Sequence, residues 1–428
     1  MNKKIGNIFK GDKVVWMVFF FLCMISVVEV FSASSGLTYK SNNFIMPIVK
    51  HSGMLLLGVF VAVVILNIPC RYFKLATPFL LAVSVLTLLW AFFGGEKING
   101  AQRVVELMGF TFQPSEIAKG TMVLVVAQIL SATQHEHGAD RNAFKYIMFL
   151  TVPIAFLIMI ENLSTAILLC TVIFLMMVVG RVPARQLAKL VGVVVGLALV
   201  LLLTAMAVGR DNGETPPGLS QARQTEAAQD STKEKKSAVA RLLRRVGTWQ
   251  SRVMTFADDE KVKPEDYDLD KDAQVAHANI AIVSSNVIGR GPGNSVERDF
   301  LAQAFSDFIF AIIIEETGIW GAAFVVLLYA ILLFRAGQIA SRCENNFPAF
   351  LVMGLAMLLV VQATFNMMVA VGIVPVTGQP LPLISKGGTS TIINCAYIGA
   401  ILSVSRSAKM RTSAGSGPKA SAGAARAE

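Results

Sequence analysis

Long apolar segments, each close to 20 residues, recur along most of this 428-residue chain. A helix of that length rises about 30 Å, which matches the hydrocarbon core of a bilayer. Apolar residues run continuously through these segments and do not alternate with period two, which disfavours a transmembrane barrel. The segments predict an all-α polytopic membrane protein with about ten transmembrane helices, at 14–33, 46–67, 75–93, 114–131, 144–160, 163–180, 188–208, 306–334, 348–371 and 389–405.

The overall composition supports the same fold class. Hydrophobic residues make up 54% of the chain and charged residues only 15%, with a mean hydropathy of +0.61. A soluble domain of average composition carries about 25% charged residues. The surplus of apolar side chains therefore has to be buried in lipid.

Basic residues in the short loops predict the orientation of the helices. Cytoplasmic loops are enriched in Lys and Arg, and a cytoplasmic N-terminus places most basic loop residues inside. We therefore expect both termini in the cytoplasm. The net charge of +10 then reflects topology, and we expect no nucleic-acid partner because no soluble basic domain is present.

The predicted organisation has five parts. Residues 1–13 form a cytoplasmic N-terminus, and residues 14–208 contain helices 1 to 7. A large polar extracytoplasmic loop follows at 209–305, between helices 7 and 8. Helices 8 to 10 occupy 306–408, and the low-complexity segment 409–428 is predicted to be a disordered cytoplasmic tail.

The stretch FQPSEIAKG opens the fourth predicted span on its outer side. Pro114 suits the first turn of a helix, and Glu116 there complements the helix dipole. Lys119 lies three residues later, so the two charged side chains share a helix face and can pair. By spacing alone, a capped helix with one ion pair explains these residues as well as a ligand site does.

A second outer stretch, VPVTGQPLPLISKGGTSTI, precedes the last predicted span. Its prolines disfavour regular helix. Gly387 and Gly388 then lie just before a helix start, where backbone N–H groups attract anions, and Lys386 would strengthen that attraction. A Gly-Gly turn before a helix is common, so this signal is weak on its own.

Three carboxylates lie in or beside the eighth predicted span. A charge at membrane depth costs about 2.5–3.5 kcal/mol on insertion scales, so each needs a physical reason. On one continuous helix, Glu315 would lie about 12 Å beyond Asp307 and Glu316 would point to the opposite side. We expect Asp307 at the outer mouth, where it can meet a substrate. Glu315 and Glu316 are expected to face the bundle interior and to pair with a base or with backbone.

These outer motifs together resemble the SEDS family (shape, elongation, division and sporulation), whose best-known members are FtsW and RodA. The stretches that carry the resemblance are NGAQR with FQPSEIAK, HANIAIVSSNVIGRGPGNS, SDFIFAIIIEETG, and NMMVAVGIVPVTGQPLPLISKGGTS. Their order and spacing fit from the third span to the tenth. The resemblance implies a SEDS-type bundle in the cytoplasmic (inner) membrane and a peptidoglycan glycosyltransferase that polymerises lipid II into glycan chains at its outer face.

The resemblance also implies roles for particular residues. Asp307 matches the family's essential aspartate and is the expected catalytic base. Arg103, Glu116 and Lys119 match a second motif, and Arg252 with Phe256 matches an R-x-x-x-F motif in the outer loop. The expected substrate-binding set is Arg103, Glu116, Lys119, Lys386, Gly387 and Gly388, although the position of Lys386 is often aromatic in relatives. No dedicated metal cage is visible, but Mg²⁺ or Mn²⁺ could be shared between the substrate pyrophosphate and one carboxylate.

Partners and alternatives follow from the same interpretation. Lipid II, lipid-linked glycan and membrane lipids are the expected small partners, and the resemblance implies a penicillin-binding transpeptidase with other divisome or elongasome proteins. The long polar outer loop favours a division role over elongation. Two other functions stay open, a lipid II flippase with charged residues lining a path across the bilayer, and a non-catalytic division scaffold.

Overall fold

The computed structural model describes residues 10–41, 46–94, 96–98, 101–107, 110–136, 138–196, 273–301 and 304–415. The chain divides into two compact units, one made of Met1–Val182 with Pro264–Glu428 and the other of Pro183–Lys263. In the second unit, residues 184–196 are helical. The first unit contains the bundle and the candidate site, and the rest of the description concerns that unit alone.

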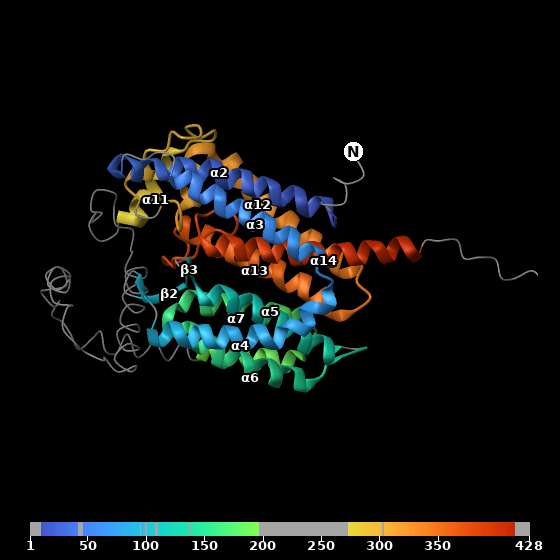
Figure 1. Ribbon diagram of the computed structural model, residues 1–428. Coiled ribbons are helices and arrows are strands. Elements are labelled where there is room, and N and C mark those ends of the chain that lie inside the picture. The colour runs from blue at the N-terminus through green and yellow to red at the C-terminus, as the bar shows by residue number, and fades with distance from the viewer. Residues whose placement is uncertain are drawn as a thin grey trace, which may run out of the picture. The chain divides into compact units, whose positions relative to one another are not determined.

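Long helices build the first unit (Figure 1). They are α2 (Lys13–Ser41), α3 (Met46–Asn67), α4 (Cys70–Gly94), α5 (Pro114–Ala132), α6 (Arg141–Glu161), α7 (Leu163–Val179), α12 (Ile309–Ser341), α13 (Asn346–Ala370) and α14 (Thr389–Gly415). Each contains most of a predicted span. Of the seventh predicted span, 188–208, residues 197–208 lie outside the described residues, so the total of ten helices stays a prediction.

Among the described residues, seven helices have the length and hydropathy to cross a membrane. They are α2, α3, α4, α5, α6, α12 and α13, while α7 is a shorter apolar helix. Many large apolar side chains on these helices are exposed, as expected for surfaces that face lipid. The chain is a multi-pass membrane protein, as the apolar segments predicted.

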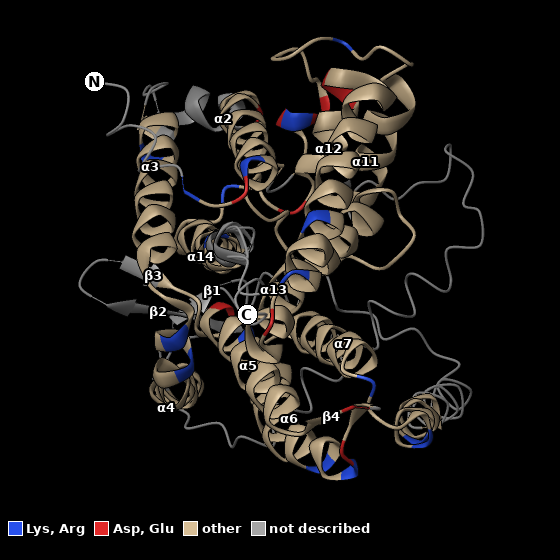
Figure 2. Cartoon of the chain, turned by 90° about the vertical axis from the view of Figure 1, so that its right-hand side faces the viewer, with Lys and Arg blue, Asp and Glu red and all other residues tan. Residues whose placement is uncertain are grey.

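Helix α13 lies centrally and packs against α12, α5, α7 and α14, as Figure 2 shows from one end of the bundle. The most extensive pairing among the described helices joins α3 and α14. Glycines permit it, since a Cβ on Gly399 would lie 2.6 Å from the carbonyl oxygen of Ala62. Small residues commonly allow such close backbone approach between membrane helices.

The two ends of the bundle differ. Helices α5, α7, α12 and α14 begin, and α2, α4 and α13 end, at what we call the loop end, with α11 (Ala273–Ser284) beside it. The opposite end, where the described chain starts and finishes, is called the terminal end (Figure 1). Helix α14 continues to Gly415, into the segment 409–428 that was predicted to be a disordered tail. Residues 416–428 lie outside the described part.

A small antiparallel sheet at the loop end was not predicted. Strands β1 (Glu96–Ile98), β2 (Ala101–Leu107) and β3 (Phe110–Phe112) follow one another, with Val105 opposite Phe112 in the second pair. The sheet leads into α5, where Pro114 occupies the first turn as expected.

Helix α12 is interrupted at Gly318, which has φ +71° and ψ −168°. A Cβ at Gly318 would lie 2.3 Å from the carbonyl oxygen of Val287, so only glycine fits. Gly289 makes the reciprocal approach, since a Cβ there would lie 2.4 Å from the carbonyl oxygen of Glu316. The glycine-rich segment after α11, residues 287–296, therefore crosses α12 in direct backbone contact.

Candidate functional site

The segment that carries Asp307 is held by hydrogen bonds to three successive carbonyls, those of residues 305–307. The backbone N–H of Lys386 donates to the first at 3.0 Å, and Ser385 Oγ donates to the second at 2.6 Å. Asn366 Nδ2 donates to the third, the carbonyl of Asp307, at 2.8 Å. These donors come from α13 and from the loop before α14, so tertiary contacts fix the backbone beneath the aspartate.

This arrangement corrects one expectation. Asp307 was expected on the same continuous helix as Glu315, but it lies in a turn, and α12 begins only at Ile309. The physical reason is that the carbonyls of residues 305–307 are occupied by donors from elsewhere in the chain. The half-buried Asp307 carboxylate accepts a hydrogen bond from Ser306 Oγ at 2.9 Å.

The loop before α14 is itself fastened to the neighbouring helices by amide side chains. Asn366 Nδ2 also donates to the carbonyl of Gln379 at 2.8 Å, and Gln362 Nε2 donates to that of Pro380 at 3.0 Å. Gln379 Nε2 donates to Thr165 Oγ1 on α7 at 2.8 Å. The segment 379–386 thus forms a fixed strap between the Asp307 turn, α13 and α7.

The expected pair on α5 is present and deeply buried. Lys119 Nζ lies 2.8 Å from Glu116 Oε1, and the exposed fractions of the two side chains are 0% and 2%. Lys119 Nζ also donates to Gln362 Oε1 at 2.7 Å, so the ion pair is connected through Gln362 to the strap at Pro380. In this conformation the Lys119 ammonium is surrounded by protein and supports the strap.

Several acceptors around the strap are buried without a hydrogen-bond partner in the described part of the chain. They are Glu116 Oε2, Asn366 Oδ1 and Gln379 Oε1. Each residue is already fixed by its other polar atom, which leaves the free oxygen in a set orientation. Buried acceptors of this kind are costly unless a donor is supplied.

Lys386 lies beside the Asp307 turn, half-exposed, with Nζ 4.8 Å above the ring of Phe305. Burial and then the positive charge of Lys50 lower the pKa of Lys386 from its ordinary value. Gly387 and Gly388 follow, and α14 begins at Thr389, so an ammonium and a helix N-terminus adjoin as expected. A helix N-terminus favours negative charge, and a nearby cation adds to that preference.

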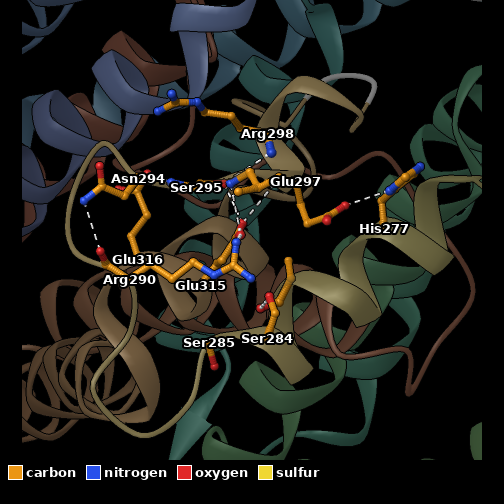
Figure 3. Close-up of polar contacts among 12 residues, drawn as sticks. His277, Ser284, Ser285, Arg290, Asn294, Ser295, Glu297, Arg298, Glu315 and Glu316 are labelled. Atoms are coloured by element: carbon orange, nitrogen blue, oxygen red, sulfur yellow. Dashed lines mark hydrogen bonds and ion pairs between the residues drawn. The ribbon is translucent and has the colours of Figure 1, made fainter.

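Figure 3 shows the polar contacts of Glu315, which is fully buried. Its Oε1 accepts from the backbone N–H of Val296 at 3.0 Å and lies 3.2 Å from Arg290 Nη1. Its Oε2 accepts from Ser295 Oγ at 2.5 Å. The carboxylate is therefore satisfied by one base and by the glycine-rich segment.

Glu316 is equally buried and serves the same segment from the next position on α12. Its Oε2 accepts from the backbone N–H of Gly293 at 3.0 Å, and its Oε1 accepts from Ser32 Oγ on α2. Arg298 Nη1 donates to Ser32 Oγ at 3.1 Å and to the carbonyl of Gly293 at 2.7 Å. The expectation that both glutamates pair with bases or backbone is confirmed.

The other expected residues fall in less well described parts. Arg103 is a residue of β2, and its side chain lies outside the described part, as do Arg252 and Phe256. Sequence reasoning missed Gln362 and Asn366, which connect the strap to α13. Their signal was available, because two amides four residues apart inside an apolar span share one helix face.

Together these residues provide two chemical capacities at the loop end. Asp307 offers a carboxylate on a fixed backbone that can accept a proton. Lys386 with the start of α14 offers positive charge for an anion. Within the described residues, no three His, Cys, Asp or Glu side chains group closely enough to hold a metal.

Curated relatives resemble most of the chain. A protein of Halomonas elongata, named probable peptidoglycan glycosyltransferase FtsW, is 28% identical over 363 residues, covering 83% of this chain and 80% of its own. A protein of Geobacter sp. (strain M18) with the same name is 28% identical over 399 residues, covering 92% and 96%.

Solved structures share the fold. A chain from a peptidoglycan synthase complex, solved to describe the coordination of polymerization and crosslinking, aligns with a TM-score of 0.67 at 23% identity, covering 93% of this chain and 98% of that one. The rod shape determining protein RodA of Thermus thermophilus aligns with a TM-score of 0.61 at 22% identity, covering 94% and 98%.

The family model FTSW_RODA_SPOVE, described as cell cycle protein, matches residues 12–212 and 236–410. These ranges include α2 to α7, the Asp307 turn, the strap and most of α14. The chain therefore belongs to the FtsW/RodA/SpoVE family of cell cycle proteins.

Proposed function

We propose that the chain is a peptidoglycan glycosyltransferase that polymerises lipid II into glycan chains at the outer face of the cytoplasmic membrane. Relatives that cover most of the chain carry the name of this activity. The observation that carries the proposal is the Asp307 turn, where tertiary hydrogen bonds hold the backbone of a half-buried carboxylate at the loop end.

The reaction needs one base. The acceptor sugar hydroxyl transfers its proton to the Asp307 carboxylate as its oxygen forms a bond to the anomeric carbon of the donor. The bond between that carbon and the lipid pyrophosphate breaks, and its electron pair leaves with the pyrophosphate oxygen. Inversion at the anomeric carbon requires no second carboxylate, which agrees with Glu315 and Glu316 being occupied by the glycine-rich segment.

The leaving pyrophosphate needs positive charge. Lys386, with Gly387 and Gly388 before α14, is half-exposed and adjoins the Asp307 turn, so it is the first candidate in this conformation. Arg103 on β2 stays a candidate. The Glu116–Lys119 pair holds the strap in place and does not contact the pyrophosphate, because its ammonium is buried and already contacts Gln362.

A divalent cation would be Mg²⁺ or Mn²⁺. The hydroxyl and carboxylate oxygens of Ser306 and Asp307 are hard donors that suit such an ion, but they are too few to hold it alone. The ion would have to be shared with substrate pyrophosphate. Bound there, it would neutralise the charge that develops on the leaving group.

The proposal extends to membrane orientation and partners. Figure 2 shows lysine and arginine residues, in blue, on α4 and in the region of α6 at the terminal end. This supports a cytoplasmic location for that end and for both termini. The similarity to a chain of a peptidoglycan synthase complex supports a penicillin-binding transpeptidase as partner. The name FtsW among the relatives favours division over elongation.

The test is polymerisation of lipid II by purified protein, with its transpeptidase partner added, in the wild type and in Asp307→Asn. Asparagine keeps the size but cannot act as a base, so we expect a loss of about 10²–10⁴-fold in rate. The matched control is Asp299→Asn, which changes an exposed carboxylate in η2 (Glu297–Asp299). Wild-type rates in Asp307→Asn would exclude Asp307 as the base. Movement of lipid II across vesicle membranes without polymer would instead indicate a flippase. Neither polymerisation nor lipid movement, in the wild type or in either variant, would indicate a scaffold.

A further inference from the structure

A groove opens between α4, α5 and α6 at the terminal end, far from the Asp307 turn. Its volume is about 610 Å³, within the range of small-molecule sites. Its walls are mainly apolar and include Leu75, Leu81, Val125 and Leu150. The loop end of α4 lies about 30 Å further along that helix, so this groove is separate from the catalytic machinery.

Pro78 in α4 leads to hydrogen bonds that join α4 to α5 along the groove. Proline has no N–H, so the carbonyl of Lys74, four residues earlier, loses its helical donor. Gln128 Nε2 on α5 replaces that donor at 2.8 Å and also donates to Thr77 Oγ1 at 2.6 Å. The spacing of α4 and α5 along the groove is therefore set by hydrogen bonds that are present without a ligand.

Two basic side chains, Arg71 and Lys74, line one end of the groove. Arg71 and Lys74 lie three residues apart at the start of α4, so they share a helix face. The Arg71 guanidinium lies 4.9 Å from the centre of the Tyr72 ring and bonds its hydroxyl at 3.2 Å. Within the described residues neither cation forms an ion pair with a carboxylate, and no acidic residue lines the groove.

The surroundings of the groove are those of a helix surface in contact with lipid. Leu75 in its wall is 74% exposed, and nearby Phe79 on α4 is 70% exposed. A ligand that fits must carry a negative charge near Arg71 and Lys74 and a long apolar part along the leucines. Basic pockets between membrane helices are known to hold anionic lipid headgroups.

We propose that this groove binds one anionic phospholipid, with its phosphate at Arg71 and Lys74 and one acyl chain along Leu75, Leu81 and Leu150. The lipid would then hold α4 to α5, the helix that also carries Glu116 and Lys119. Binding is expected to stabilise the bundle against unfolding, and its measurement needs no turnover.

The experiment compares full-length protein in detergent with added phosphatidylglycerol, phosphatidylcholine of the same chains, or inorganic phosphate. Native mass spectrometry counts retained lipid, and thermal unfolding reports stabilisation. We expect phosphatidylglycerol alone to be retained and to raise Tm. In Arg71→Gln/Lys74→Gln its apparent affinity should fall about 30-fold, given the attraction of two cations for an anionic headgroup.

The matched control is Lys145→Gln/Arg342→Gln, which removes two exposed cations at the same end outside the groove. It should keep the response to phosphatidylglycerol. Equal responses to both lipids, an effect of phosphate alone, or equal loss in the control would overturn the proposal. If Arg71→Gln/Lys74→Gln fails to fold, Leu150→Trp tests the site instead, because the larger side chain fills the groove. Loss of retained phosphatidylglycerol with an unchanged lipid-free Tm would support the site. Retention of phosphatidylglycerol by this variant would overturn the proposal.

Discussion

The side-chain amide of Asn366, in the last turns of α13, donates to the backbone carbonyl of Asp307 at 2.8 Å. The same nitrogen donates to the carbonyl of Gln379. One buried side chain therefore sets the distance between the turn that carries the proposed base and the strap that leads to Lys386. Any change at Asn366 should alter geometry without removing a reacting group.

Asn366→Ala should lower kcat for lipid II polymerisation about 10²-fold, the size of effect produced by a displacement of about 1 Å at a reacting group. The half-buried carbonyl of Asp307 and the buried carbonyl of Gln379 would each lose a donor, and loss of a donor costs up to about 1–3 kcal/mol of stability where the carbonyl is buried. KM should change little, since no substrate contact is removed. Steady-state kinetics of the purified variant measure both constants.

Thr364→Ala on the same helix is the control, because its exposed hydroxyl donates to the carbonyl of Val360 within its own helix. It should leave kcat and KM unchanged. A large rise in KM with an unaltered kcat in Asn366→Ala would indicate direct substrate binding by Asn366 and contradict the positioning role.

The helical framework was predictable because long apolar segments in lipid have to satisfy every backbone group internally. The ends of α3 and α5 match the predicted spans within about a residue. The pairing of Glu116 with Lys119 was predictable for a similar reason, since residues three apart on a helix are neighbours. Both are local properties of the sequence.

The Asp307 turn was not predictable in this way. Residues 306–334 have the pattern of one continuous helix, but the donors that hold the turn lie 59 and 79 residues away along the chain. Such contacts exist only once α12, α13 and the strap have packed together. The sheet before α5 is different, because the short alternating pattern around Val105 and Phe112 is a local signal of strand structure.

The buried pair on α5 can be tested by a double-mutant cycle. Lys119→Met leaves Glu116 buried and unpaired, which typically costs about 3–5 kcal/mol of stability. Adding Glu116→Gln removes that charge and should restore most of the loss. Thermal or chemical unfolding of the single and double variants gives the coupling energy.

The same variants separate the two roles of Lys119. If the pair only supports the strap at Pro380, the double variant should recover polymerisation along with stability. A double variant that is stable but has a greatly raised KM for lipid II would show that Lys119 binds the substrate directly.

The break in α12 gives a prediction about the glycine-rich segment. Gly318→Ala should destabilise the bundle by more than the roughly 1–3 kcal/mol that this combination of positive φ and extended ψ costs a residue with a Cβ, because the new Cβ would also overlap the carbonyl oxygen of Val287. Gly337→Ala on the same helix is the control. Its Cβ would meet only Met353 Sδ at 4.0 Å, so it should be neutral or slightly stabilising. Equal unfolding temperatures for the two variants would contradict the close contact.

Lys386 gives a prediction about pH. Its pKa is lowered by burial and by Lys50, so it loses its charge at a lower pH than an ordinary lysine. If the ammonium holds pyrophosphate, KM for lipid II should rise as pH increases through that lowered pKa.

Lys386→Arg keeps its charge and should give a flat KM over the same alkaline range. Lys386→Met should raise KM by roughly 10- to 100-fold at every pH, since a hydrogen bond to a charged group is lost. Steady-state kinetics from neutral pH to about pH 10 give KM for all three proteins. A Lys386→Met variant with the wild-type KM and pH profile would show that another cation holds the pyrophosphate, and Arg103 would be the next residue to test.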